Sequence, residues 1–445
     1  MDWPGFDRRA AHPSPTGVNG ADQTAVSARR ARAPWHAASG PEWPARAHGD
    51  GEAPPGADAR RARVLLWHLG RAGAGAKFTA ELAKEMRANP GLEIAVAASR
   101  RSELEERSRA LGLPTYAAPT FEGDKSAWRG KASAALGLAR LPALTRGFRR
   151  LLAEGRIDVA MCTMPAVWDV AVVAALSRVP TRLVLVLHDA FLHPGDEYPM
   201  RQAILHRNAR SADALVVLSD HVREQAVNAL GYPAERVWKM PHGAFAYGDA
   251  PRPASHPRGA RPLRLLFFGR IMPYKGLSHL LRACRALQEE GVPTDLTIAG
   301  SGNLEPYAGL LDRLHGVQVH NRWLDDAEIG SFMAASDFAV LPYTEASQSG
   351  VAATAYAAGR PVVATPVGGL AEQVIHGATG LLARDMSVEA LADALRAFIE
   401  APALLDRCAA GALDHAKGPL SWRRSAEVAA EAISAVLAAP RRGGR

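Results

Sequence analysis

The chain has 445 residues, of which 48% are hydrophobic and 22% charged, a composition typical of a water-soluble globular protein with room for two domains. No uncharged apolar run reaches the roughly 18 residues that a transmembrane helix needs, and no apolar leader follows Met1, so we expect a cytoplasmic protein. The net charge of +8 favours an anionic partner, but the basic residues are not interleaved with aromatic ones, which argues against nucleic acid.

Residues 1–60 are rich in Pro, Gly, Ala and Arg and show neither a helical nor a strand period. A segment of this composition cannot bury enough apolar surface to offset the conformational entropy that is lost on ordering. We therefore expect residues 1–60 to form a disordered tail.

The first predicted strand, VLLWHL after Arg63, leads into the glycine-rich turn GRAGAGAKF and a helix over residues 77–87. The turn is not a P-loop, because Phe78 stands where Ser or Thr would bind magnesium. Phe78 also occupies the third glycine position of a dinucleotide-binding fingerprint. Two interpretations of Gly73 and Gly75 remain: a tight strand-to-helix turn, or a place where the backbone approaches a substrate.

Strand-like runs separated by helical stretches recur through the first half of the chain, at residues 93–98, 115–118, 158–163, 183–187 and 214–218. This alternation predicts a parallel sheet in an α/β fold. His188 follows one of these runs and so lies at the carboxyl edge of the sheet, where open α/β sheets bind ligands, although a lone histidine can equally be structural. His193 has weaker support as a site residue.

A basic segment over residues 125–156 interrupts the alternation. Its only acidic residue is Glu154, and its basic residues are Lys125, Arg129, Lys131, Arg140, Arg146, Arg149, Arg150 and Arg156. Apolar residues such as Leu144, Phe148 and Leu151 lie between them. The mixture suits either a helix that lies on anionic lipid headgroups or the solvated face of an ordinary helix.

The second half begins after residues 246–262, whose Pro, Arg and Gly content predicts a linker. The string RLLFFGRIMPYKGLSHLL then predicts a strand, a turn at Gly269 and a helix that opens at Lys275-Gly276. A helix N-terminus in this position binds anions, because its first N–H groups are unpaired and the helix dipole is positive there. Arg270 and Lys275 flank the turn and together suit a diphosphate.

Two further turns of this half follow predicted strands. The GSG string at residues 300–302 suits the wall of a nucleotide cleft. The string SQSG at residues 347–350 precedes a predicted helix over 351–358, so its N–H groups and the hydroxyls of Ser347 and Ser349 could hold phosphate or sugar oxygens.

The string GRIMPYKG resembles the donor-diphosphate motif of family-4 retaining glycosyltransferases, and the resemblance covers nearly all of residues 61–437. It implies an α/β fold of the GT-B type, in which two Rossmann-like doubly wound domains face each other across a cleft. The implied organisation is an acceptor-side domain at 61–245, the linker at 246–262, a nucleotide-sugar-binding domain at 263–420 and a helix at 421–437 that crosses back to the first domain.

The resemblance also implies roles for single residues. Arg270 and Lys275 would bind the donor diphosphate, and His188 would lie beside the donor sugar. The other residues implied in donor binding are Gly73, Gly75, Gly269, Gly300, Gly302, Ser347, Gln348, Ser349, Gly350 and Thr354.

One feature of the family is altered in this chain. The family usually carries two glutamates eight residues apart, of which the first contacts the donor sugar and the second the ribose. Their places fall here on Ala346 and Thr354, with Glu345 one residue out of register. Glu345 could still serve the sugar if the loop shifts by one residue, whereas Thr354 could offer the ribose only a neutral hydroxyl.

The resemblance predicts a metal-independent retaining glycosyltransferase of the hexosyltransferase type, which needs no cofactor. Its donor would be a nucleoside-diphosphate sugar and its acceptor a lipid-linked or saccharide hydroxyl, in polysaccharide or glycolipid synthesis. Contact with anionic lipid would place it on the inner face of the membrane. Two alternatives remain open: a nucleotide-sugar epimerase on the same fold, and a catalytically silent scaffold, which only the change at Thr354 supports.

Overall fold

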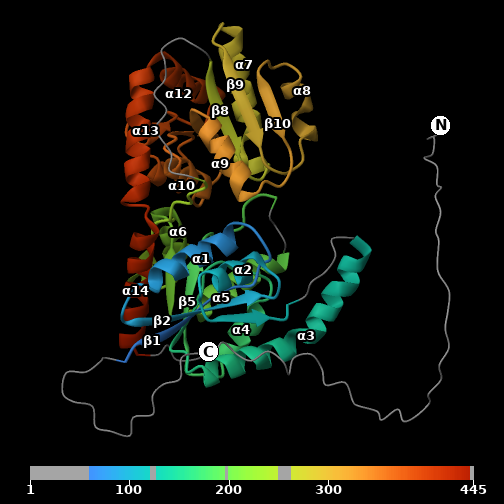
Figure 1. The fold of residues 1–445 in the computed structure, drawn as a ribbon. Helices are drawn as coiled ribbons and strands as arrows, with labels where there is room; N and C mark the ends of the chain where they lie inside the picture. The colour runs from blue at the N-terminus through green and yellow to red at the C-terminus, as the bar shows by residue number, and fades with distance from the viewer. Residues whose placement is uncertain (1–59, 121–126, 196–198, 249–261, 441–445) are drawn as a thin grey trace, which may run out of the picture. The chain divides into compact units, whose positions relative to one another are not determined.

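The computed structural model describes residues 60–120, 127–195, 199–248 and 262–440 (Figure 1). Apart from residue 60, the predicted tail lies outside these ranges, as does most of the predicted linker at 246–262. None of the helices in the described ranges combines the length and the apolar character that crossing a bilayer requires.

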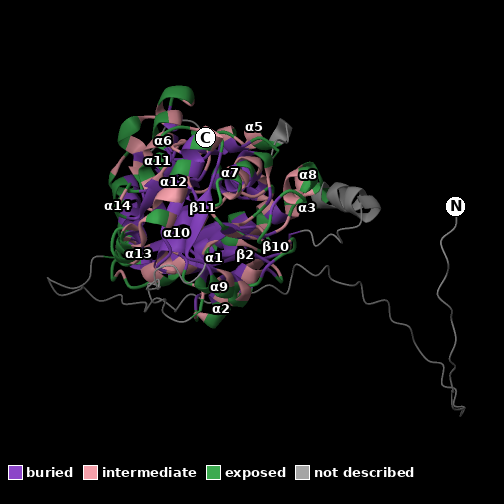
Figure 2. Ribbon diagram, turned by 90° about the horizontal axis from the view of Figure 1, so that it is seen from above, coloured by how far each residue is buried: buried purple, intermediate pink, exposed green. Residues whose placement is uncertain are grey.

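The first half of the chain builds a parallel sheet whose strands run in the order β3-β2-β1-β4-β5-β6-β7. Its strands are rich in Val, Leu and Ala and are mostly buried (Figure 2), as expected for a parallel sheet that helices cover on both faces. The strands are β1 (Ala62–His68), β2 (Leu92–Ser99), β3 (Thr115–Ala118), β4 (Val159–Cys162), β5 (Arg182–Leu187), β6 (Ala214–Val217) and β7 (Val237–Lys239).

The helices of this half alternate with the strands. The Ser219 hydroxyl accepts a hydrogen bond from the N–H of Val222 and so caps α6, which continues as a π-helical turn over Gln225–Ala229. The helices are α1 (Ala74–Met86), α2 (Glu103–Ala110), α3 (Ala127–Glu154), α4 (Asp169–Leu176), α5 (Pro199–Ser211) and α6 (Asp220–Glu224).

The second half repeats this plan with a second parallel sheet in the order β10-β9-β8-β11-β12-β13. Its strands are β8 (Leu263–Phe268), β9 (Thr294–Ala299), β10 (Val317–His320), β11 (Phe338–Leu341), β12 (Val362–Ala364) and β13 (Gly380–Leu382). Its helices are α7 (Leu277–Glu289), α8 (Ala308–Leu311), α9 (Asp326–Ala335), α10 (Gly350–Ala357), α11 (Leu370–Gln373), α12 (Val388–Glu400) and α13 (Pro402–Lys417).

The strand order of each sheet reverses at one place, between β1 and β4 in the first sheet and between β8 and β11 in the second. Open α/β sheets bind their ligands outside the carboxyl ends of the strands at such a reversal, because the loops on either side diverge there. The loops that meet this description follow β1, β4, β8 and β11. They are the natural place for a site.

The last helix, α14 (Trp422–Ala438), packs on the first sheet although it follows the second in sequence. Trp422, Ala429 and Ile433 belong to the same core cluster as Val64 of β1 and Phe78 of α1. The indole N–H of Trp422 also donates a hydrogen bond of 3.0 Å to the carbonyl of Ala244.

Predicted and observed helix starts differ at the two glycine turns that follow β1 and β8. The helix expected from Lys77 begins at Ala74, directly after Gly73. The helix expected to open at Lys275-Gly276 is preceded by a 3-10 turn over Pro273–Lys275, and α7 begins only at Leu277. Gly276 explains the later start of α7, because its φ of 67° is left-handed and interrupts the helix. No other residue fits there, since a Cβ would lie 1.7 Å from the carbonyl oxygen of Pro342.

Within the basic segment, residues Ala127–Glu154 form α3, and the burial of three of its apolar residues contradicts part of the lipid interpretation. Leu144, Phe148 and Leu151 are at most 7% exposed and belong to the core beside the first sheet. These apolar side chains therefore do not face lipid, contrary to the lipid interpretation. The arginines of the same turns, including Arg146 and Arg149, are exposed.

Candidate functional site

Lys275 makes a specific contact with a buried tyrosine. Its ammonium donates a hydrogen bond of 2.7 Å to the hydroxyl of Tyr343 and lies 4.2 Å from the centroid of that ring. Burial raises the pKa of Tyr343 well above its ordinary value, so the phenol stays neutral. Its hydroxyl is also 3.4 Å from Oγ of Ser349, at the start of α10. Tyr343 was missed at the sequence level, although its place just after β11 marks it.

Arg270 and Gly269 lie in the loop between β8 and the turn that carries Lys275. The Arg270 side chain is exposed, and the N–H of Gly269 donates a hydrogen bond of 3.0 Å to the carbonyl of Ala299. Close packing accounts for the glycines of the neighbouring loop. A Cβ on Gly300 would lie 1.9 Å from the carbonyl oxygen of Gly269, and one on Gly302 would lie 2.4 Å from that of Ile271.

The SQSG loop is held from both sides. The N–H of Ser349 donates a hydrogen bond of 2.6 Å to the side-chain oxygen of Gln373, and the carbonyl of Ser347 accepts one of 2.7 Å from the Ser219 hydroxyl. Gly350 begins α10, where an added Cβ would lie 3.3 Å from the His242 ring. The loop therefore contacts residues of the first half of the chain. The side-chain oxygen of Gln348 is buried without a hydrogen-bond partner among the described residues.

Thr354 does not lie open to a ligand in this structure. It is 4% exposed, and its hydroxyl donates a hydrogen bond of 2.8 Å to the carbonyl of Gly350 within α10. The ribose contact predicted for Thr354 would have to use the remaining lone pairs of a buried hydroxyl.

His188 directly follows β5 and lies in a buried cluster of aromatic rings. Its Nε2 donates a hydrogen bond of 2.8 Å to the carbonyl of Thr163, and its ring meets the edge of Phe78 at 5.0 Å between centroids. His68 and His242 are buried nearby, and burial lowers the pKa of all three histidines, that of His242 to about 4. All three rings are therefore neutral near pH 7.

His193 has more polar contacts than its weak support in the sequence suggested. Its two ring nitrogens lie 3.1 Å from oxygens of Asp189 and Glu345. Its ring stacks on Tyr274, with 4.7 Å between centroids. The i, i+4 spacing of Asp189 and His193 was the available signal, but the partner Glu345 is distant in sequence.

The glycine turn after β1 packs closely against side chains. A Cβ on Gly75 would lie 2.6 Å from Nε2 of His68, and one on Gly73 would lie 3.3 Å from the Trp323 ring. Trp323 is 63% exposed and belongs to the second half of the chain. The turn thus lies where the two halves meet.

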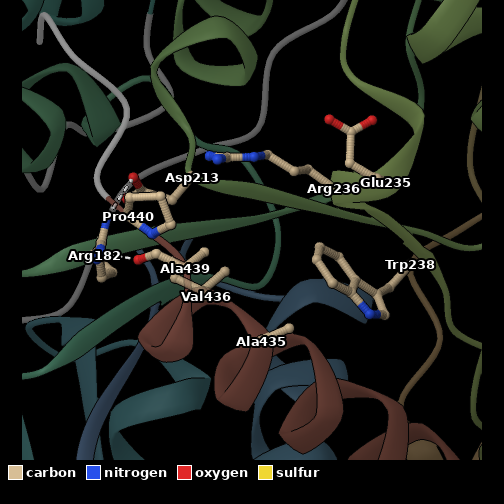
Figure 3. Close-up of a pocket in the computed structure, with 9 residues that line it drawn as sticks. All are labelled: Arg182, Asp213, Glu235, Arg236, Trp238, Ala435, Val436, Ala439 and Pro440. Carbon is tan, nitrogen blue, oxygen red and sulfur yellow. Dashed lines mark hydrogen bonds and ion pairs between the residues drawn. The ribbon is translucent and has the colours of Figure 1, made fainter.

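The described residues contain no group of three or more His, Cys, Asp or Glu side chains arranged for a metal ion. A pocket of about 230 Å³ lies at the opposite, amino edge of the first sheet, between β5, β6 and β7 and the end of α14 (Figure 3). Arg182, Asp213 and Trp238 are among its lining residues. It shares no residue with the site described above.

Comparison with known families agrees with this geometry. Residues 73–243 match the glycosyl transferase 4-like domain, and residues 262–401 match glycosyl transferases group 1. The chain belongs to the group 1 glycosyltransferases. The family resemblance seen in the sequence is thereby confirmed.

Curated proteins of known activity align with parts of the chain. A glycogen synthase of Mycobacterium tuberculosis is 31% identical over 53% of this chain and 56% of its own length. A D-inositol 3-phosphate glycosyltransferase of Actinosynnema mirum is 35% identical over 48% of this chain and 56% of its own length. The chain therefore spans about half the length of the curated relatives it matches.

Solved structures match over more of the chain. The Anabaena protein Alr3699/HepE, in complex with UDP and glucose, superposes with a TM-score of 0.64 at 19% identity, over 84% of this chain and 100% of its own. Sucrose-phosphate synthase of Thermosynechococcus elongatus superposes with a TM-score of 0.64 at 17% identity, over 85% and 100%. The predicted fold class, GT-B with two Rossmann-like parallel-sheet domains, is confirmed.

Proposed function

We propose that this group 1 glycosyltransferase transfers a hexosyl unit from a nucleoside-diphosphate sugar to a hydroxyl, with retention of configuration. The observation that carries the proposal is the position of Lys275, whose ammonium is fixed on Tyr343 beside the N-terminus of α10. The HepE structure with UDP and glucose supports a nucleotide-sugar donor.

Transfer requires the bond between C1 of the sugar and the diphosphate oxygen to break. Negative charge then grows on the leaving diphosphate, and stabilising that charge is the main catalytic task. Lys275 and the exposed Arg270 would supply two positive charges, and the first N–H groups of α10 would add the field of a helix N-terminus. These groups can do this work without a divalent cation, so we propose metal independence.

Retention fits attack by the acceptor hydroxyl on the face that the diphosphate leaves, with a leaving-group oxygen taking the acceptor proton. This route needs no pair of carboxylates of the glycosidase type. His188 and Glu345 would face the sugar. The acceptor would be lipid-linked or a saccharide, in polysaccharide or glycolipid synthesis, and the exposed arginines of α3 suit a peripheral contact with anionic lipid on the inner face of the membrane.

The test is turnover of UDP-, GDP- and ADP-linked hexoses by the purified protein, with the anomeric configuration of the product read by NMR. Lys275→Ala and Arg270→Ala should each lower kcat/KM at least about a hundredfold, since each removes about 2.7 to 4 kcal/mol of transition-state stabilisation. Arg285→Ala is a matched control, because Arg285 is an α7 cation paired with Glu289. The Arg285→Ala variant should keep a kcat/KM close to that of the wild type. Addition of EDTA should leave the turnover of the wild-type protein unchanged.

Three results would contradict the proposal. Near-normal turnover of Lys275→Ala would refute the diphosphate assignment. A new sugar epimer formed without acceptor would identify an epimerase, and the absence of donor binding would identify a silent scaffold.

A further inference from the structure

His193 lies between two carboxylates that come from different halves of the chain. Its Nδ1 is 3.1 Å from Oε1 of Glu345, and its Nε2 is 3.1 Å from Oδ1 of Asp189. Asp189 and His193 follow β5 of the first sheet, whereas Glu345 follows β11 of the second. The imidazole therefore joins loops at the carboxyl edges of the two sheets.

The partners of the ring determine its protonation. A carboxylate only accepts hydrogen bonds, and a neutral imidazole has a single N–H to donate. Both contacts can be satisfied only when both ring nitrogens carry a proton. Burial opposes this charge, but the hydrogen bonds to Asp189 and Glu345 outweigh it and raise the pKa of His193.

The other neighbours of the ring are compatible with a cation. It stacks on Tyr274 at an interplanar angle of 21°, and the Ser347 hydroxyl is 3.5 Å from its Nε2. Lys275 is a second cation in this region, since its ammonium lies 5.7 Å from the centroid of Tyr274. The carboxylates of Asp189 and Glu345 offset these charges.

Glu345 is held by His193 but remains accessible. Its side chain is 47% exposed, so it can accept a further hydrogen bond. Ala346, which stands at the place of the family's first glutamate, is 3% exposed and has no polar side-chain atom. The contact with His193 is what orients the out-of-register carboxylate.

We infer that His193, protonated on both ring nitrogens, is a positioning residue that holds the Glu345 carboxylate where it accepts a hydrogen bond from a hydroxyl of the donor sugar. This inference rests on the proposed function, because it requires a sugar donor. His193 itself touches no reacting atom in this scheme.

The inference has a pH dependence with a definite sign. Loss of one proton leaves one ring nitrogen with a lone pair that faces a carboxylate. The imidazole can then no longer donate to Asp189 and Glu345 together, and the bridge that fixes Glu345 is broken. Because the pKa of His193 is raised above its ordinary value of 6.5, the contact is complete below pH 6.5 and is lost as the pH rises through the raised pKa.

The protonation is tested first, without any substrate, by NMR titration of full-length protein labelled with ¹³C-histidine. His193→Gln assigns the signal. The expected result is a pKa above 6.5 in the wild type, which Glu345→Gln lowers. A wild-type pKa at or below 6.5 would overturn the inference.

The positioning role is tested by the pH profile of donor turnover with UDP-glucose, GDP-mannose and ADP-glucose. His193→Gln and Glu345→Gln should each lower kcat/KM about 10- to 100-fold, the usual effect of losing a hydrogen bond to a charged group. The double variant should lose no more than either single one, because the two residues act as a unit. The affinity for UDP alone, measured by calorimetry, should stay within about twofold of wild type, since the diphosphate is bound elsewhere.

The alkaline limb of the wild-type pH profile should be absent from the profile of His193→Gln. His315→Gln, which replaces an exposed histidine, is the control and should keep that limb. Two results would overturn the inference: an alkaline limb that is unchanged in His193→Gln, or losses of kcat/KM that multiply in the double variant. If Lys275→Ala is inactive in the same assays, the proposed function itself still stands. Wild-type protein that neither binds nor turns over any of the three donors would overturn the proposed function as well.

Discussion

The Lys275 ammonium donates a hydrogen bond of 2.7 Å to the Tyr343 hydroxyl. The two residues follow β8 and β11, the strands between which the order of the second sheet reverses. Lys275 carries a long flexible side chain, and a fixed partner reduces the entropy that it would lose on binding a diphosphate. Tyr343 thus positions the cation that the proposed reaction needs.

Tyr343→Phe should lower kcat/KM about 10- to 100-fold, since the loss of one hydrogen bond to a charged group costs about 1.5 to 3 kcal/mol. The ring that supports the ammonium remains in this variant. The melting temperature should stay close to that of the wild type. Tyr307→Phe, at a half-buried tyrosine of the same domain, is the control for phenol removal. Equal activity of the Tyr343→Phe and wild-type enzymes would show that Lys275 needs no support.

Thr354→Glu should destabilise the protein and should not improve donor affinity. Thr354 is 4% exposed, and a carboxylate buried there without a partner costs on the order of several kcal/mol or takes up a proton. Thr354→Ser, which keeps the hydroxyl, is the control. Thermal unfolding and calorimetry with UDP-glucose measure both quantities. A stable Glu variant that binds the donor more tightly than wild type would mean that this position opens to the ribose.

The buried histidines predict acid lability. Burial lowers the pKa of His242 from 6.5 to about 4, so between these values the unfolded chain binds more protons than the folded one. The contribution of neutral His242 to the free energy of unfolding is therefore fully present above pH 6.5. It is lost as the pH falls toward 4, and its size is on the order of 3 kcal/mol. Unfolding in urea from pH 7.5 to 4.5 should show this loss, and His242→Asn should reduce its slope. A slope that is the same in both proteins would assign the acid lability to other groups.

The exposed arginines of α3 predict electrostatic binding to anionic vesicles. The turns of α3 from residue 139 onward bury Leu144, Phe148 and Leu151, so these turns would contribute mainly charge, about 1 kcal/mol for each basic residue at the headgroups. Replacing Arg146 and Arg149 by Ala should therefore weaken co-sedimentation with phosphatidylserine vesicles at least about tenfold. Replacing the exposed Arg423 and Arg424 of α14 is the matched control. Co-sedimentation that depends on neither the salt concentration nor the lipid charge would rule out this membrane contact. The acceptor would then be a soluble one.

The sequence by itself determined the architecture. The apolar runs and the glycine turns that follow them are local patterns, and a parallel sheet buried on both faces leaves few other ways to satisfy them. Among the runs predicted in the first half, Thr115–Ala118 matches β3 and the other runs differ from their strands by one or two residues at the ends, whereas β7 was not predicted. The family and the GT-B fold were predicted from the resemblance that the GRIMPYKG string carries, and they are confirmed. The roles assigned to Arg270 and Lys275 remain predictions.

Only the tertiary structure decided which side chains meet. The contact between His193 and Glu345 joins residues 152 positions apart, and no local period encodes a pairing between loops of two separate sheets. The same holds for Tyr343 as the partner of Lys275. The burial of Phe148 and of Thr354 likewise depends on what packs over them. A basic helix and a polar residue look the same in sequence whether they face solvent, lipid or core, because burial is a property of neighbours that the chain brings together only on folding.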